Sequence, residues 1–422
     1  MNFNTILYRF GLEPSNFENR IIEPISTESG FLYELFQADN DRTCPYCGNK
    51  ENYKHNYFYT ETSCCTNDQL KETLRIRKIR YKCRKCGKTF TNPIAGIDSH
   101  DTITRQVKEM ICNDFFKMMS FKEIADKYNL TKMRVIQLFD EVIDYVPRKP
   151  LPKTLCIDEK RFKDKKGSKY ICILYDFENK VIVDVIRSRQ LAYLNEYFSE
   201  ISQKERDNVK YFVCDMYDGY NTVHRKFFPG SILIIDLFHI TRQLTEAVNS
   251  LRISEMNRTS KSSIRYKFMK RYWKYFLCRK EDIPDKFMTE NESGHRYHFD
   301  DLVFECLKYD NELRTGYNIL QDFYHYYLKR NYDEALNFIK FISDRCIDSN
   351  NSKLVKVGDT FLKWRYGIAN TISRSQNQFH PSNSAAENMN NHIETLIRIS
   401  YGFNNFERFR KRILLVKTYK NG

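Results

Sequence analysis

The sequence predicts a multidomain α/β protein, and three observations lead to this prediction. Two C-x-x-C pairs lie in the N-terminal part of the chain, a helical apolar pattern follows them, and short strands then alternate with helices. A chain of 422 residues is also too long for one ordinary hydrophobic core. We therefore expect small N-terminal domains followed by a larger α/β domain.

Composition limits the partners and the compartment of the protein. The net charge of +15 indicates a polyanionic partner, because clustered Lys and Arg attract phosphate groups. No apolar run reaches the roughly 18 residues of a membrane span, and no secretion signal is recognisable, so we expect no membrane partner. Thirteen cysteines, four of them in C-x-x-C pairs, favour a reducing compartment and metal binding over disulfides.

The two C-x-x-C pairs predict a zinc ribbon over residues 41–95. Each pair is followed by a glycine that suits a tight knuckle turn, and four thiolates can close a tetrahedral Zn²⁺ site. The segment 74–81 alternates basic and apolar residues and reads as a strand entering the second knuckle. The expected zinc ligands are Cys44, Cys47, Cys83 and Cys86. Alternative ligands, expected instead to be ordinary ribbon residues, are Cys64, Cys65 and His55.

Residues 104–146 have the apolar spacing of helices. Ser120 and Glu123 form a predicted capping box, and Thr131 is expected to cap the next helix. Two short helices around a tight corner at residues 129–130 predict a helix-turn-helix, whose last helix commonly enters the major groove of DNA. A plain helical bundle is the alternative. The groove-facing candidates are Lys132, Arg134 and Gln137.

A proline-rich linker at 147–152 precedes a regular series of strands and helices. The expected strands are 154–158, 170–175, 181–186, 211–214 and 232–235, and the expected helices are 191–201, 220–228 and 236–251. Three strands with a hairpin, followed by alternating helices and strands, is the order of a ribonuclease-H-like domain.

Two of these strands end on an acid. In a sheet of this order the first and fourth strands are neighbours, so Asp158 and Asp215 should meet at one sheet edge. Two converging carboxylates require a cation, and oxygen ligands at a partly open site suit Mg²⁺ or Mn²⁺. The alternative is that Asp215 only starts a turn or caps a helix. A third carboxylate is needed from a helix, and the candidates are Glu387 and Glu394. Helix physics alone does not separate metal binding from other roles: Glu387 fits equally well as a capping-box partner of Ser384, and Glu394 as a solvated residue on the helix surface.

The span from Asp215 to the C-terminal acids is too long for the rest of a ribonuclease-H-like domain, so residues 254–372 are expected to form a helical insertion. Its segment 258–280 alternates Lys and Arg with aromatic residues and contains no acid. That pattern suits a surface that binds phosphates and unpaired bases. The alternative is an amphipathic helix with core aromatics, and we expect Trp273 and Phe276 to be core. The DNA-contact candidates here are Arg265, Lys267, Lys270, Arg271 and Lys274.

These motifs together resemble DDE-type bacterial insertion-sequence transposases of the ISL-three family over nearly the whole chain. The resemblance includes the ribbon, the helix-turn-helix, the IDE of the first strand, DMYDGY, DLFH and the tail ENMNNHI, followed by Arg398, Gly402-Phe403, Phe406 and Phe409. It implies that Asp158, Asp215 and Glu387 form a catalytic triad with Mg²⁺ or Mn²⁺. It also implies that the protein cuts and joins double-stranded DNA at the terminal inverted repeats of its own element and at target DNA.

The resemblance has further implications and two departures. Asp236 and His239 of DLFH are support candidates near the site; alternatively, Asp236 only caps the next helix. The family usually has Gly where this chain has Asn388, and Lys near Glu394. A catalytically inactive DNA-binding regulator derived from a transposase is therefore the alternative function. A homodimer on DNA, located in the bacterial cytoplasm at the nucleoid, is expected.

The expected domain boundaries follow from these assignments. They are an N-terminal arm at 1–40, the zinc ribbon at 41–95, the helix-turn-helix at 100–147, the first part of the ribonuclease-H-like domain at 153–253, the helical insertion at 254–372, and the last part of the catalytic domain at 373–416.

Overall fold

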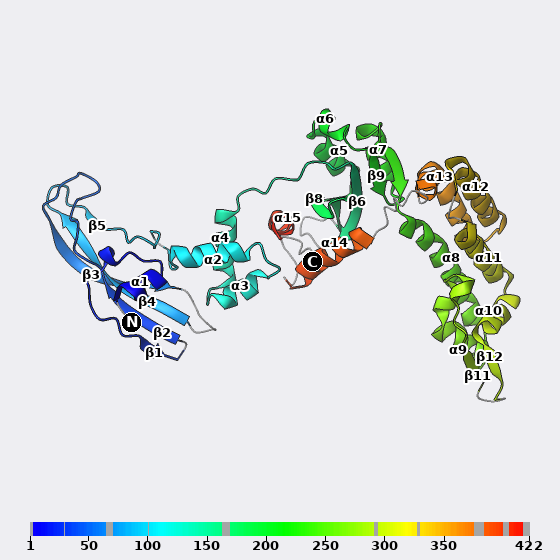
Figure 1. The fold of residues 1–422 in the computed structure, drawn as a ribbon, viewed down its shortest axis with the longest axis horizontal. Helices are drawn as coiled ribbons and strands as arrows, with labels where there is room; N and C mark the ends of the chain where they lie inside the picture. The colour runs from blue at the N-terminus through cyan, green and yellow to red at the C-terminus, as the bar shows by residue number, and fades with distance from the viewer. Residues whose placement is uncertain are drawn as a thin grey trace. The chain divides into compact units, whose positions relative to one another are not determined.

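The computed structural model describes residues 3–28, 30–64, 71–99, 101–162, 169–290, 294–326, 330–374, 384–399 and 405–416. The chain forms two compact units (Figure 1). The first combines Met1–Pro147 with Ile393–Gly422, and the second is Arg148–His392. Each unit is described separately.

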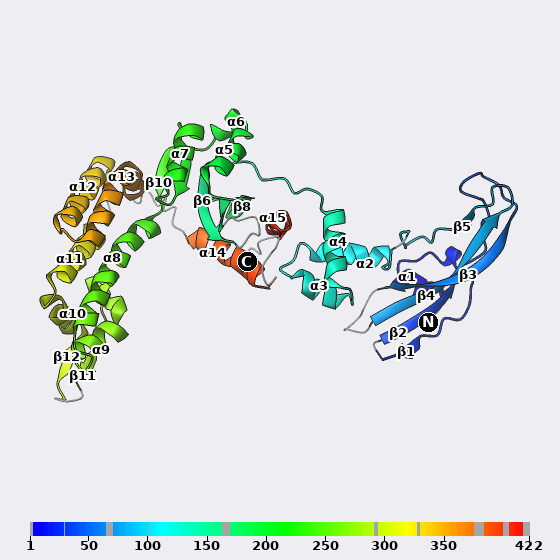
Figure 2. The ribbon, with the colours of Figure 1, turned by 180° about the vertical axis from the view of Figure 1, so that it is seen from behind.

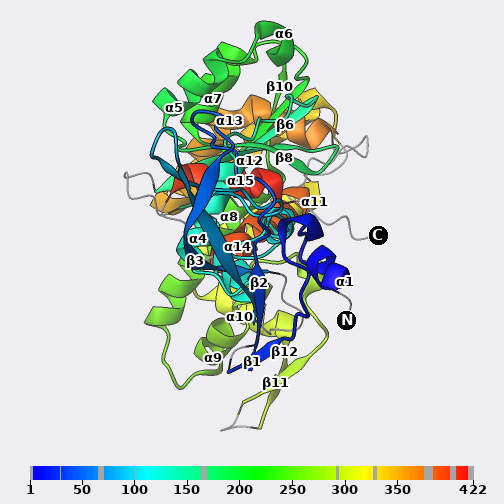
Figure 3. The ribbon, with the colours of Figure 1, turned by 90° about the vertical axis from the view of Figure 1, so that its left-hand side faces the viewer.

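The first unit begins with a mixed β-sheet (Figure 3). Its strands are β1 (Ile25–Thr27), β2 (Gly30–Phe36), β3 (Asn52–Ser63), β4 (Lys71–Cys83) and β5 (Thr89–Thr91). The order is β1-β2-β4-β3, with β5 also paired to β4; β2 runs parallel to β4, and β3 runs antiparallel to it. Residues expected to form an N-terminal arm thus supply two strands of the sheet, together with helix α1 (Phe3–Arg9) and the 3-10 turn η1 (Pro14–Asn16).

The two halves of β4 bury opposite faces. Leu74 and Ile76 pack in a core with α1 and β2, whereas Ile79 and Tyr81 pack beside the cysteines. Positions 76 and 79 are an odd number of residues apart, so their side chains point to opposite sides of the strand. Each half of the strand therefore leaves its other face uncovered by these two cores.

Three helices follow: α2 (Arg105–Asp114), α3 (Phe121–Lys127) and α4 (Lys132–Val142). The predicted capping box of Ser120 and Glu123 is present, and the side chain of Thr131 caps α4 as expected. Asn129 turns the corner between α3 and α4 with a φ of 53°, which Asn tolerates better than most residues. The helices pack around three mutually perpendicular or tilted aromatic rings, those of Phe115, Phe121 and Phe139.

The C-terminal helix α15 (Phe406–Leu415) packs onto these three helices. Arg412 is 1% exposed, and its guanidinium donates to the carbonyls of Phe115, Lys117 and Met119, which follow α2. Burial lowers the pKa of Arg412 to about 10. The Phe115 carbonyl is at the C-terminus of α2, so the cation stabilises it both by a hydrogen bond and through the helix dipole. These hydrogen bonds attach helix α15 to the segment that follows α2.

The second unit contains a five-stranded sheet in the order β10-β9-β6-β7-β8. Its strands are β6 (Thr154–Arg161), β7 (Tyr170–Asp176), β8 (Val181–Ile186), β9 (Tyr211–Cys214) and β10 (Ile232–Ile235). The predicted strands and the β6–β9 adjacency are confirmed. One prediction is wrong: β6 does not end at Asp158, because pairing with β7 carries it on to Arg161.

Helices α5, α6 and α7 lie beside this sheet, and further helices continue away from it (Figure 2). They are α5 (Leu191–Ser199), α6 (Gln203–Arg206), α7 (Asp218–Phe227), α8 (Leu237–Arg258), α9 (Ile264–Arg271), η2 (Trp273–Phe276), η3 (Lys280–Asp282), α10 (Phe299–Lys308), α11 (Asn311–Tyr326), α12 (Tyr332–Asp348) and α13 (Ser352–Arg374), with the hairpin β11 (Phe287–Thr289) and β12 (Arg296–His298) before α10. The helix α14 (Ser384–Ile399) follows.

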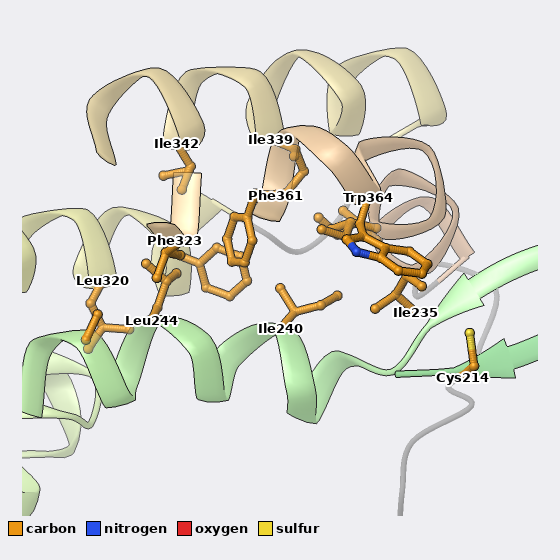
Figure 4. Packing of buried hydrophobic residues seen from close by; sticks show 14 of the residues in the cluster. Cys214, Ile235, Ile240, Leu244, Leu320, Phe323, Ile339, Ile342, Phe361 and Trp364 are labelled. Carbon is orange, nitrogen blue, oxygen red and sulfur yellow. The ribbon is translucent and has the colours of Figure 1, made fainter. Parts of the chain in front are cut away.

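One hydrophobic core runs from the sheet through the helices of residues 254–372. Cys214 and Ile235 of the sheet belong to the same buried cluster as Ile240 of α8, Phe323 of α11 and Trp364 of α13 (Figure 4). The segment expected as a helical insertion is indeed helical, and it shares its core with the sheet.

Helix α13 also covers the edge of the sheet. The hydroxyl of Thr371 accepts a hydrogen bond from Ile235 N at 3.0 Å and donates to Ile235 O at 2.6 Å, and the amide of Asn370 donates to Leu233 O at 3.0 Å. Gly367 permits this close approach, because a Cβ there would lie 2.8 Å from Ile235 Cγ1. The exposed edge of β10 is thus paired with helix side chains rather than left open.

Candidate active site and zinc centre

The first two candidate acids lie side by side at the sheet. β6 and β9 are parallel and pair Cys156 with Val213. Continuing this register by two residues places Asp158 beside Asp215. The charge of Asp158 is one of the causes that raise the pKa of Asp215, so the two carboxylates lie near each other at the carboxyl ends of the parallel strands.

Asp236 joins them at the same level. β9 and β10 are parallel and pair Cys214 with Ile235, so the next positions, Asp215 and Asp236, are also neighbours. Each of the three acids directly follows a residue of the main core. The three preceding core residues are Ile157, Cys214 and Ile235.

Asp215 has an unusual acidity. Burial and then the charges of Glu159 and Asp158 raise its pKa to about 7, although a hydrogen bond from Tyr217 N and the charge of Arg189 act to lower it. The Tyr217 N–H donates to Asp215 Oδ1 at 3.1 Å. An ionised Asp215 is thus poorly compensated by the protein alone. Its oxygen-only, negatively charged surroundings fit Mg²⁺ or Mn²⁺.

Glu159 and Arg189 form a second cluster beside these acids that our sequence reasoning missed. The Arg189 guanidinium forms an ion pair with Glu159 and lies 4.6 Å and 4.7 Å from the ring centroids of Tyr170 and Tyr217. Glu159 was visible as the last letter of the IDE motif. Arg189 had no local signal, because its partners come from three separate strands and loops.

Asp236 caps helix α8 and also approaches His239. Its Oδ1 accepts a hydrogen bond from Phe238 N at 3.0 Å, and its Oδ2 lies 3.9 Å from His239 Nε2. Burial lowers the pKa of His239, although the negative charge of Asp158 raises it in part. Both expectations for Asp236, capping and closeness to the acids, are therefore compatible in this geometry.

The third catalytic candidate, Glu387, belongs to helix α14. The side chains of residues 384–390 and of residue 392 lie outside the described part of the structure, and neither metal binding nor capping by Glu387 is tested. Asn391 and Glu394 on the same helix are exposed.

The raised pKa of Asp215 leads to a prediction about stability without metal. An unfolded Asp titrates near 3.9, so the folded protein binds this proton more tightly, and Asp215 costs stability as the pH rises from about 4 to about 7. Asp215→Asn should therefore stabilise the metal-free protein by about 1–2 kcal/mol at pH 8, allowing for partial exposure, and by less at pH 5. Thermal unfolding in EDTA measures this. Equal shifts of Tm at both pH values would contradict the assigned environment.

The four predicted zinc ligands come together. The sulfur atoms of Cys44, Cys47, Cys83 and Cys86 all lie within 4.8 Å of one another. The Cys44–Cys86 and Cys47–Cys83 sulfur distances are 3.7 Å and 3.5 Å. Tetrahedral Zn²⁺ with bonds of about 2.3 Å requires sulfurs about 3.8 Å apart, so the cluster fits the ion closely. The knuckle glycines, Gly48 and Gly87, adopt φ values of 70° and 72°, as the turns require.

Of the alternative ligands, the two that the structure describes are not part of this cluster. Cys64 is buried in the neighbouring core with α1, and His55 is exposed at an irregularity of β3. Cys65 lies outside the described residues.

The candidate DNA contacts on α4 differ in how accessible their side chains are to DNA. Lys132 and Gln137 are exposed. Arg134 is partly buried, and its guanidinium lies 2.9 Å from Asp101 and 3.2 Å from Glu141. A DNA contact by Arg134 would therefore compete with two ion pairs inside the protein.

The basic segment 258–280 is divided between surface and core. Lys267, Lys270, Arg271 and Lys274 are exposed. Arg265 is partly buried, with its guanidinium 3.9 Å from the ring centroid of Tyr309. Phe276 is fully buried as predicted, but the core prediction for Trp273 is wrong: it is 40% exposed at the start of the short turn η2, where the helix face no longer continues.

Comparison with known proteins identifies a family. A family model described as a transposase, DDE type and ISL3, matches residues 155–413, more than half of the chain. A curated protein of Lactococcus lactis subsp. lactis, named an ATP-dependent protease, is 31% identical over 115 residues. That segment is 27% of this chain and 34% of the relative, so the similarity spans about a third of the relative's length. In the described residues no helix has the length and apolar character of a membrane span.

Proposed function

Because this chain belongs to the ISL3 family of DDE transposases, we propose that it is a catalytically active DNA transposase. It binds the terminal inverted repeats of its insertion sequence and catalyses metal-dependent strand cleavage and strand transfer. The observation that supports this proposal is the closeness of Asp158 on β6 to Asp215, which directly follows the parallel neighbour β9: the charge of Asp158 helps to raise the pKa of Asp215.

Each acid has a distinct role in the proposed reaction. Asp158 and Asp215 hold a divalent cation from the sheet, and Glu387 completes its ligands from α14. A cation held there would supply activation of the attacking oxygen and stabilisation of the leaving oxygen of a phosphodiester. Asp215 must lose its proton to act as a ligand, so the affinity for the cation should rise as the pH approaches about 7. Asp236 supports the site by fixing the start of α8 next to these acids.

Other parts of the chain recognise the DNA. The zinc ribbon and the α3–α4 pair, acting as a helix-turn-helix, bind the element's ends, and a homodimer brings two ends together. The exposed cations of residues 258–280 hold phosphates. The sequence has no G-x-x-x-x-G-K-[ST] motif for ATP phosphates, so we do not propose ATP-dependent proteolysis for this chain.

A catalytically inactive regulator is the second candidate, and the departures at Asn388 and Glu394 favour it. DNA flanking the gene supplies the test, since inverted repeats bracketing it define the substrate. A labelled duplex carrying such a repeat should be cut in Mg²⁺ and left intact in EDTA. Tight binding to the repeat without cutting in Mg²⁺ or Mn²⁺ would identify the regulator instead.

The two groups of candidate DNA contacts predict different losses. Charge reversal at Lys267, Lys270 and Lys274 should weaken binding to all sequences and flatten its salt dependence, as loss of phosphate contacts does. Substitution of Lys132 or Gln137 by Ala should instead change which bases are preferred, typically by about 1–3 kcal/mol at one position. Binding measured against a panel of mutated repeats separates these results. A uniform loss from both groups would refute groove reading by α4.

A further inference from the structure

The basic strand β4 distributes its cations over two faces. Strand alternation places Arg75 and Arg77 on one face and Arg80 and Lys82 on the other, where Lys78 joins them. No acid occurs between Thr73 and Ile97, so neither face is neutralised from within this segment. Any compensating acid must come from a neighbouring strand or loop.

On the face of Arg75 and Arg77, acids from neighbouring segments compensate the positive charge. The Arg75 guanidinium lies 3.5 Å from the Glu34 carboxylate on β2 and 2.9 Å from that of Glu61 on β3. That of Arg77 lies 4.0 Å from the Glu18 carboxylate. These cations serve the fold, because β2 and β3 supply acids to Arg75 and the segment before β1 supplies one to Arg77.

On the opposite face, formed by Lys78, Arg80 and Lys82, no described acid pairs with these cations. The ladder pairs these three with Phe58, Asn56 and Tyr53 on β3, and β5 contributes Thr91 and Thr89 opposite Arg80 and Lys82. Among the residues that the structure describes, none of the three cations forms an ion pair. Burial alone lowers the pKa of Lys78, as expected for an ammonium group with no acid beside it. We call this surface the Lys78 face.

Aromatic rings accompany the cations on the Lys78 face. The Arg80 guanidinium lies 4.8 Å from the ring centroid of Phe58, and Tyr53 is 40% exposed beside Lys82. Successive cations on one face of a strand are about 6.8 Å apart, since each residue advances the strand by about 3.4 Å. A row of cations beside aromatic rings on an open sheet is the arrangement that binds single-stranded nucleic acid.

We propose that the Lys78 face binds a single strand of DNA, with Lys78, Arg80 and Lys82 on its phosphates and with Tyr53 and Phe58 stacked on unpaired bases. A duplex keeps its bases inside and cannot offer them to rings on a flat sheet. This inference rests on the proposed function only in taking DNA as the partner. During the reaction, the DNA bound to the Lys78 face would be the single strand that becomes unpaired next to a cut end.

The test compares two matched variants of the full-length protein. Lys78→Gln/Arg80→Gln/Lys82→Gln removes three charges from the Lys78 face. Arg20→Gln/Arg75→Gln/Arg77→Gln removes three from the other face, where Arg20 lies over Phe36 at 4.3 Å. Binding of a fluorescent oligothymidine is measured by anisotropy in EDTA over a range of salt concentrations. Zinc content and thermal unfolding are measured for both variants to verify the fold.

The Lys78-face variant should bind oligothymidine at least about tenfold more weakly, and its salt slope should fall by about 2, since each phosphate contact on a single strand contributes about 0.7. The other-face variant should stay within about twofold of the wild type. Tyr53→Ala should weaken binding about fivefold or more without changing the salt slope, because stacking carries no counterion.

Three outcomes would overturn the proposal. The two triple variants could lose oligothymidine binding equally, the wild type could show no measurable binding of oligothymidine, or the Lys78-face variant could lose binding only to a hairpin duplex. The last would assign the Lys78 face to duplex DNA. None of these measurements involves cleavage. A protein that fails to cut DNA can therefore still satisfy the proposal, and an active transposase can still refute it.

Discussion

The Asp215→Asn variant is expected to lose about a thousandfold or more of DNA cleavage while keeping its fold and its binding to the element's ends. Asn preserves the shape of the side chain and can still accept the hydrogen bond from Tyr217 N. It removes one of the negative ligands of the metal, and such a loss raises the barrier by several kcal/mol. Strand transfer should fall with cleavage, since both reactions use the same carboxylates.

Matched variants extend this prediction. The cleavage activity of Asp158→Asn and of Glu387→Gln should fall as steeply as that of Asp215→Asn, because each substitution removes one carboxylate ligand from the same ion. Glu394→Gln is the control: Glu394 is exposed on the same helix as Glu387, and its variant should stay close to the wild type. Cleavage of an end-containing duplex in Mg²⁺ and in Mn²⁺ measures all four. Normal cutting by Asp215→Asn, or an inactive Glu394→Gln beside an active Glu387→Gln, would refute the assignment.

Loss of any zinc ligand is expected to unfold the ribbon around the cysteines. The core there is small, consisting of Cys44, Ile79, Tyr81, Cys83 and Phe90. Zinc binding in comparable small domains contributes about 10–16 kcal/mol, which such a core cannot replace. Cys47→Ser should therefore release the ion, and the ribbon should become sensitive to proteolysis. The second unit should stay folded, because its core does not involve these residues.

Cys278→Ser is the matched control for zinc. Cys278 is half-buried in the second unit and is not one of the clustered cysteines. Elemental analysis of reduced, freshly purified protein should find one zinc per chain in the wild type and in this control, and none in Cys47→Ser. A wild-type protein without zinc, or a Cys47→Ser variant that retains it, would contradict the prediction.

The sheet of the second unit was predictable because its signals are local. Each short strand is an apolar run with clear turn residues, and the parallel order then brings Asp158 next to Asp215. The zinc cluster was predictable for the same reason, since the C-x-x-C spacing determines the geometry of each knuckle. Caps such as Ser120 with Glu123 also depend only on neighbouring residues.

Features that depend on distant contacts were not predictable. The length of β6 is determined by its pairing with β7, and the role of residues 25–36 is determined by pairing with β4. Helix α15 carries no sign that it contacts α4, yet Arg408 forms hydrogen bonds with Asp140 across 268 positions of sequence. The pairing of Arg189 with Glu159 and the exposure of Trp273 likewise depend on packing.

The central claim is that Asp158, Asp215 and Glu387 hold one catalytic ion, and metal-directed cleavage of the protein tests it most directly. Fe²⁺ is bound in place of Mg²⁺, and ascorbate with hydrogen peroxide then generates radicals that cut the backbone near the ion. We predict fragments ending close to all three residues, competed away by excess Mg²⁺ and absent from Asp215→Asn. Fragments ending near Glu394 but not near Glu387, or an unchanged pattern in Asp215→Asn, would contradict the claim.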